Sequence, residues 1–138
     1  MKKQIHLLST LLFISTMALA QSKPIKIVFD LTSGDTLDHQ VALRHISLEA
    51  KAHPDAQLEL VVYGKAMPIF VKDQSTVAKG IQELASNKNV SLRVCAQTMK
   101  HYNITTNDLL PGVQTVPDGI LEVVAKQGEG WGYIKESH

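Results

Sequence analysis

Short apolar runs alternate along this sequence with segments of helical periodicity, and this alternation limits the folds that the chain can adopt. A nearly continuous apolar run such as residues 25–31 is typical of a parallel strand that is covered on both faces. Strands that alternate with helices at this spacing predict βαβ units, in which a parallel sheet lies between helical layers. The sequence therefore predicts one α/β domain, with strands at residues 25–31, 58–63, 90–94, 113–116 and 131–135.

The longest helix is expected directly after the first strand. From Leu37 the sequence carries a broad apolar face at helical spacing. Asp35 or Thr36 is expected to be the N-cap of this helix, because both side chains can accept a hydrogen bond from its first turn. The helix should end near Ala52, since Pro54 disfavours helical backbone at the residue before it.

The later helices are shorter. Ser75 is expected to cap a second helix, and a third should begin at Ala96, directly after the third strand. Pro117 is expected in the first turn of the last helix, where its missing N–H is tolerated. Residues 66–71 are apolar but contain Pro68, which favours a loop or a short helical turn over a strand.

The start of the chain has the pattern of a secretory signal peptide. Met1-Lys2-Lys3 is positively charged, residues 7–19 are apolar or hydroxylic, and Ala18-Leu19-Ala20 forms a small-residue cleavage site before Gln21. The apolar run is too short to span a bilayer as a helix, and no cysteine follows the cleavage site to carry a lipid. We therefore expect residues 1–20 to be removed and the mature chain to be periplasmic, without a membrane anchor.

The charge of the remaining chain is close to neutral. Without Lys2 and Lys3, 12 basic residues face 13 acidic ones, so the net charge is −1 with histidine neutral. A chain without a basic block offers no electrostatic footprint for nucleic acid or for anionic lipid. Residues 21–138 are enough for one domain with its own core and too few for two.

Cys95 is the only cysteine of the chain, and it follows the third strand where a helix is expected to begin. At such a junction free backbone N–H groups and the positive end of a helix dipole converge, which favours the reactive thiolate. A lone cysteine in an oxidising compartment cannot form an internal disulfide. It is therefore a buried small hydrophobe, a link between chains, or a thiol kept for chemistry.

Three loops should meet at the carboxyl edge of the predicted sheet, where ligands of open α/β sheets bind. They are residues 32–38, 64–68 and 95–98. His39 could accept a proton from Cys95, although a solvated histidine in the first turn of a surface helix is the favoured alternative. The binding candidates on this rim are Thr32, Gly34, Asp35, His39, Gly64, Gln97 and Thr98.

Other familiar sites are not indicated by the sequence. Ser33-Gly34-Asp35 lacks the glycine spacing and the charge of a phosphate loop. No H-x-x-x-H or C-x-x-C pair is present, so we expect neither a structural zinc site nor a dithiol. Chemistry carried by the thiol of Cys95 itself would require no cofactor. A minor alternative is a soft-metal Cu(I) site at Cys95, Met99 and His101, although methionine at such a place is more often a core residue.

Several segments together carry a resemblance to a known family. In their order and spacing they are similar to the DsrE/DsrF-like (YchN-like) superfamily, in its small exported branch, with residues 21–138 as the domain. The segments are residues 29–35 with 42–44, 61–64, 95–99, 109–113, 116–120 with Glu122, and 130–135.

The resemblance implies a three-layer α/β/α fold of flavodoxin-like character, with a five-stranded, mainly parallel sheet and assembly into homotrimers or hexamers. In cytoplasmic relatives a cysteine in the corresponding stretch receives sulfane sulfur and passes it on as a persulfide, and Cys95 is the matching position. The expected function is thus periplasmic sulfur relay, with thiosulfate, polysulfide or a protein persulfide as sulfur partner. The alternatives are a non-catalytic oligomeric protein that binds a small ligand or partner and buries Cys95, or a copper-binding protein.

Overall fold

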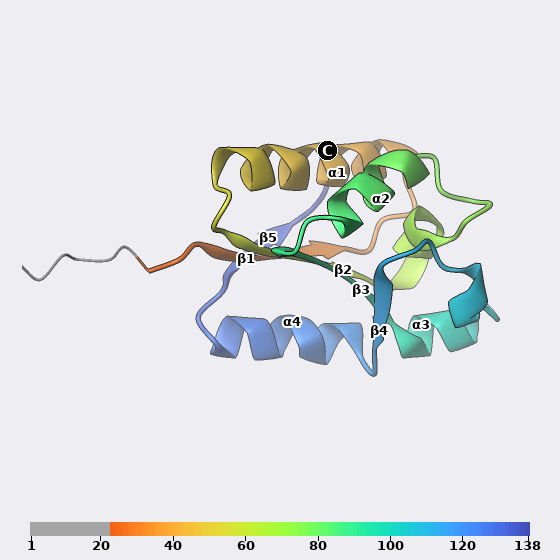
Figure 1. Ribbon diagram of the computed structural model, residues 1–138. Coiled ribbons are helices and arrows are strands. Elements are labelled where there is room, and N and C mark those ends of the chain that lie inside the picture. The colour runs from red at the N-terminus through yellow and green to blue at the C-terminus, as the bar shows by residue number, and fades with distance from the viewer. Residues whose placement is uncertain (1–22) are drawn as a thin grey trace, which may run out of the picture.

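A parallel sheet of five strands runs through the middle of the structure, and helices lie on both of its faces (Figure 1). The computed structural model describes residues 23–138, so the predicted signal peptide at residues 1–20 lies outside the described residues. The strand order is β4-β3-β2-β1-β5, and every neighbouring pair is parallel, which confirms the predicted α/β fold class. The strands are β1 Lys26–Leu31, β2 Gln57–Val62, β3 Val90–Cys95, β4 Val113–Val116 and β5 Gly132–Lys135.

Helices α1 and α2 cover one face of the sheet, whereas α4 lies on the other face with α3 near its end (Figure 1). Asp35 caps α1 as predicted, since its Oδ1 accepts a hydrogen bond from the Leu37 N–H at 2.8 Å. The helices are α1 Thr36–Ala52, α2 Ala78–Ala85, α3 Ala96–His101 and α4 Gly119–Gly128, and the 3-10 helices are η1 Gly64–Phe70 and η2 Thr106–Asp108. The apolar segment with Pro68 is thus the expected short helical turn. None of the helices within residues 23–138 is long and apolar enough to cross a membrane.

Two predicted helix starts are wrong by a few residues. Asp118 caps α4 by accepting hydrogen bonds from the Ile120 and Leu121 N–H groups, so Pro117 precedes the helix. Ser75 accepts a hydrogen bond from the Val77 N–H, but α2 begins only at Ala78. Asp118 supplies the acceptor that the first N–H groups of α4 need, so the helix begins after it. Ser75 instead forms a local side-chain turn with Val77 before α2 begins.

The two faces of the sheet differ in chemistry. The face under α1 and α2 carries the main apolar core, which includes Phe29, Leu60 and Leu92. The face under α4, which we call the α4 face, has only a small apolar cluster of Val28, Val61 and Val123, with Tyr63 and Trp131 packed against it. Side chains alternate along a strand, so the remaining positions of this face are filled by other residue types. On the three central strands they include Asp30, Glu59, Ser91, Arg93 and Cys95.

Candidate functional site

Cys95 ends β3 and holds the N-cap position of α3. Its thiol is free, and the residue is 5% exposed. Gly119, the first residue of α4, lies directly against it, because a Cβ added to Gly119 would be 3.1 Å from the Cys95 Cβ. The same added atom would be 3.0 Å from Cδ1 of Tyr63. Two helices therefore begin beside the only thiol of the chain, and the N-termini of helices stabilise negative charge.

The buried carboxylate of Asp30 lies on the same α4 face, close to Tyr63. Asp30 is 4% exposed, and its Oδ2 accepts hydrogen bonds from the Tyr133 hydroxyl at 2.7 Å and from Lys135 Nζ at 3.2 Å. Lys135 Nζ also donates to Thr32 Oγ1 at 2.7 Å. These contacts join β1 to β5, which are neighbours in the sheet.

Tyr63 connects this carboxylate cluster to Cys95. Burial, together with the nearby Asp30 carboxylate, raises the pKa of Tyr63 to about 12, and Cys95 lies close enough to contribute. Burial and the hydrogen bond to Asp30 likewise raise the pKa of Tyr133 to about 12. Both hydroxyls therefore stay protonated at neutral pH, and that of Tyr133 remains the donor to the buried Asp30 carboxylate.

The three predicted rim loops do lie together. A Cβ on Gly34 would be 3.1 Å from the Lys65 carbonyl oxygen, which brings the first loop against the second. The Gly64 N–H donates to Thr98 Oγ1 at 3.0 Å, which joins the second loop to the third. Gly64 has a φ of +62°, a conformation that suits glycine. Thr32, Gly34, Gly64 and Thr98 are thus brought together, and their part in binding stays a prediction.

Comparison with known proteins identifies the family. The model of the DsrE/DsrF-like family matches residues 26–135, which contain every strand of the sheet. The chain belongs to the DsrE/DsrF-like family. No match is found among curated proteins.

Two solved structures share the fold of this DsrE/DsrF-like chain. One is the protein of unknown function MTH1491 from Methanobacterium thermoautotrophicum, with 24% identity and a TM-score of 0.75 over 80% of this chain and 98% of that one. The other is the ychN protein from E. coli, with 15% identity and a TM-score of 0.64 over 81% of this chain and 98% of that one. At these identities the similarity concerns the fold alone.

His39 is not the surface histidine that the sequence favours. It is 2% exposed, and its Nε2 lies 2.9 Å from the Ser33 carbonyl oxygen. The reason is helical spacing, since His39 lies three and seven residues before Ala42 and Ile46 on the buried face of α1. Within residues 23–138 no hydrogen bond joins His39 to Cys95.

The remaining candidates lie outside the thiol environment. Asp35 is exposed and acts as the cap of α1, and Gln97 is exposed on α3. Met99 is buried in the main core, whereas His101 is exposed with its ring edge-on to Tyr102 at 4.8 Å. The described part of the chain has no group of three or more His, Cys, Asp and Glu side chains placed to hold a metal ion.

Sequence reasoning missed the residues that surround the thiol, namely Tyr63, Gly119 and the Asp30 cluster. One signal was available, because Asp30 alternates with the apolar Phe29 and Leu31 and must therefore point away from the main core.

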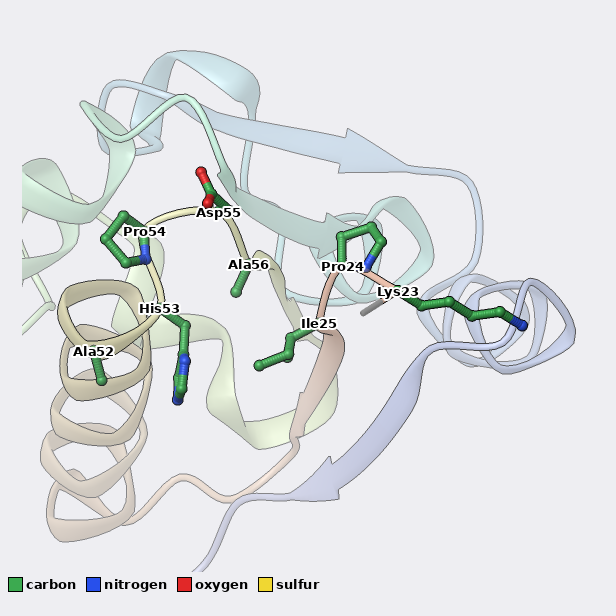
Figure 2. Close-up of a pocket in the computed structure, with 8 residues that line it drawn as sticks. All are labelled: Lys23, Pro24, Ile25, Ala52, His53, Pro54, Asp55 and Ala56. Atoms are coloured by element: carbon green, nitrogen blue, oxygen red, sulfur yellow. The ribbon is translucent and has the colours of Figure 1, made fainter. Parts of the chain in front are cut away.

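A cavity of about 680 Å³ lies at the amino ends of β1 and β2, away from Cys95, between residues 23–25 and residues 52–56 (Figure 2).

Proposed function

We propose that this DsrE/DsrF-like protein is a periplasmic sulfur-relay protein that carries sulfane sulfur as a persulfide on Cys95. The observation that supports it most is the placement of the only thiol where α3 and α4 both begin. A persulfide anion on Cys95 would face two helix N-termini, which favour negative charge. Membership of the family adds support, since Cys95 lies within the matched residues.

The chemistry needs only the cysteine and a sulfur donor. The Cys95 thiolate attacks the outer sulfur of the donor's S–S bond, so that a new S–S bond forms on Cys95 while the donor's bond breaks. The electron pair of the broken bond leaves with the other donor sulfur, as sulfite from thiosulfate or as a thiolate from a persulfide. The acceptor thiolate then attacks the outer sulfur of the Cys95 persulfide, so that this sulfur moves to the acceptor and Cys95 leaves as its thiolate. No external oxidant, reductant or cofactor takes part.

Loading requires a small rearrangement at the site. Cys95 is 5% exposed, and Gly119 and Tyr63 pack against it. The donor therefore reaches the thiol only when the start of α4 moves away from the end of β3. A glycine at this place leaves the contact without a side chain that would have to be displaced.

Assembly into a homotrimer or hexamer is part of the same proposal. Ile120, Leu121 and Val124 of α4 are 58%, 64% and 57% exposed and form an apolar stripe beside the thiol site. Contiguous exposed apolar side chains often mark protein contacts. Replacing Leu121 by Lys should reduce the molar mass measured by light scattering, whereas Leu48→Lys, at a 56% exposed side chain of α1 on the opposite face of the sheet (Figure 1), should not.

Intact-mass analysis tests sulfur loading. The mature protein is incubated with thiosulfate or polysulfide, and a gain of one or two sulfur atoms that a reductant reverses is expected. Cys95→Ser should show no gain. A double variant, Cys95→Ser with Ser86→Cys, keeps one thiol but places it at the C-cap of α2, where the helix dipole disfavours a thiolate, and it should load more slowly. If the double variant loads sulfur at the same rate, the position of Cys95 at the starts of α3 and α4 does not favour loading.

The alternative is a binding or assembly protein in which Cys95 is packed as a small apolar residue. The 5% exposure of Cys95 favours it. It predicts that alkylation of the native protein is slow and limited by unfolding, and that no donor loads sulfur. The sulfur-relay proposal predicts alkylation that is faster than global unfolding, because only the start of α4 has to move.

A further inference from the structure

A second polar region lies on the α4 face, towards the amino ends of the strands. A cavity of about 270 Å³ lies there, lined by side chains of β2, β3 and α4. Its charged and polar lining includes Glu59, Lys88, Ser91, Arg93, Lys126 and Trp131. Three of these side chains are cationic and one is a carboxylate, so the lining has an excess of positive charge.

Most of the unpaired buried polar atoms of the described residues gather at this cavity. Glu59 Oε1, Arg93 Nε and Trp131 Nε1 lack a hydrogen-bond partner, and the fourth such atom belongs to Asp30. Glu59 is 1% exposed, so its orphan oxygen lies deep in the fold. A buried polar atom without a partner is costly, and three in one place indicate that a bound group completes them.

Two of the three orphan atoms can only donate a hydrogen bond, and Glu59 can become a third donor. Glu59 faces Arg93 from β3 and both Lys126 and Glu122 from α4, with Oε2 3.6 Å from Arg93 Nε and 3.3 Å from Lys126 Nζ. Burial and the nearby Glu122 raise the pKa of Glu59, against the opposing effect of the two cations. A protonated Glu59 would release both cations and donate from its own hydroxyl.

We infer that this cavity binds a small anion, an inorganic oxyanion or a short organic carboxylate, whose oxygens accept hydrogen bonds from Trp131 and Arg93. Lys126, whose ammonium also lies 4.7 Å from the centre of the Trp131 ring, adds a charge contact. The cavity volume of about 270 Å³ is large enough for either kind of anion. The site uses residues other than Cys95, so it does not depend on the sulfur-relay proposal.

Trp131 makes the proposal directly measurable, because it is the only tryptophan of the chain. Its fluorescence is followed while sodium sulfate, thiosulfate, acetate or succinate is added at constant ionic strength set with NaCl. A saturable change is expected with at least one probe. The probe that saturates at the lowest concentration separates the oxyanion source from the carboxylate source.

Variants separate a built site from general charge screening. Arg93→Gln should weaken binding about tenfold or more, as expected for the loss of a charge-assisted hydrogen bond. Lys79→Gln makes the same charge change on α2, at a side chain that is 92% exposed, and should leave binding unchanged. Glu59→Gln should bind more tightly, because it removes the only negative charge of the lining. Trp131→Phe keeps an aromatic ring but removes the N–H donor, and it should bind the anion more weakly. Because this variant lacks the tryptophan signal, its binding is measured by calorimetry.

Three results would overturn the inference. The first is the absence of a saturable signal with all four probes in both fluorescence and calorimetry. The second is equal weakening in Arg93→Gln and Lys79→Gln, which would show screening alone. The third is weaker binding in Glu59→Gln than in the parent protein. Where Arg93→Gln or Glu59→Gln does not fold, unchanged binding in Trp131→Phe would overturn the inference instead.

Discussion

Gly119→Ala tests the close packing of α4 on the thiol. The new methyl group would lie 3.1 Å from the Cys95 Cβ, 3.0 Å from Tyr63 Cδ1 and 3.3 Å from Tyr63 Cβ. Two of these atoms are β-carbons, whose positions are fixed by the backbone and do not change when the side chain rotates. Forcing a methyl group into such a contact typically costs 1–3 kcal/mol.

Helix propensity acts in the opposite direction. Alanine is favoured over glycine by at most about 1 kcal/mol in a helix, so Gly119→Ala should lower the free energy of unfolding by about 1 kcal/mol net. Gly128→Ala is the matched control, because Gly128 is the last residue of the same helix and a Cβ there meets nothing within 4 Å. The control should be neutral or stabilising.

Urea denaturation of the two variants and the parent measures both effects, provided that the m-values agree. A change of 1 kcal/mol corresponds to a shift of roughly 4 °C in melting temperature for a domain of this size. Gly119→Ala should also slow alkylation and sulfur loading of Cys95, because the methyl group closes the approach. If both variants stabilise the protein equally, the packing of α4 on Cys95 is refuted.

Two further predictions concern other polar contacts. Tyr133→Phe removes the 2.7 Å hydrogen bond to the buried Asp30 and should lower the free energy of unfolding by about 1–2 kcal/mol, whereas Tyr102→Phe, at an equally exposed tyrosine, should be neutral in the same denaturation assay. The hydrogen bond that the His138 ring donates to Asp38 raises the pKa of His138 above 6.5, so this contact stabilises the fold fully below pH 6.5 and is lost as the pH rises through the folded-state pKa. Hydrogen bonds from Ser33 and His138 lower the pKa of Asp38, so the contact also weakens under acid as the pH falls below 3.8. Asp38→Asn should therefore lower the His138 midpoint in an NMR titration, and an unchanged midpoint would contradict the pairing.

The strands and their order along the chain could be predicted from local pattern. Apolar runs of about six residues and helical spacing are properties of neighbouring residues, and so are the Asp35 cap and the position of Cys95 at the end of a strand. These features depend on backbone preferences that act within one turn or one strand.

The polar chemistry of the α4 face could not be predicted in this way. Tyr133 meets Asp30 across 103 residues of sequence, and the contact exists only because β5 lies next to β1. Gly119 meets Cys95 for a similar reason, since α4 returns across the sheet from β4. The burial of His39 depends on how α1 is rotated about its axis on the sheet. The polar and apolar residues of α1 are only weakly separated between its two faces, so the sequence does not fix this rotation.

The most direct test of sulfur relay is a single-turnover transfer. Protein loaded with sulfur is freed of donor and mixed with a low-molecular-weight thiol, and intact mass is followed for the protein while sulfane sulfur is followed on the acceptor. The account predicts that the added sulfur leaves Cys95 and appears on the acceptor in equal amount, and that Cys95→Ser transfers none. Protein that never gains sulfur at Cys95, or that keeps it in the presence of the acceptor, would contradict sulfur relay.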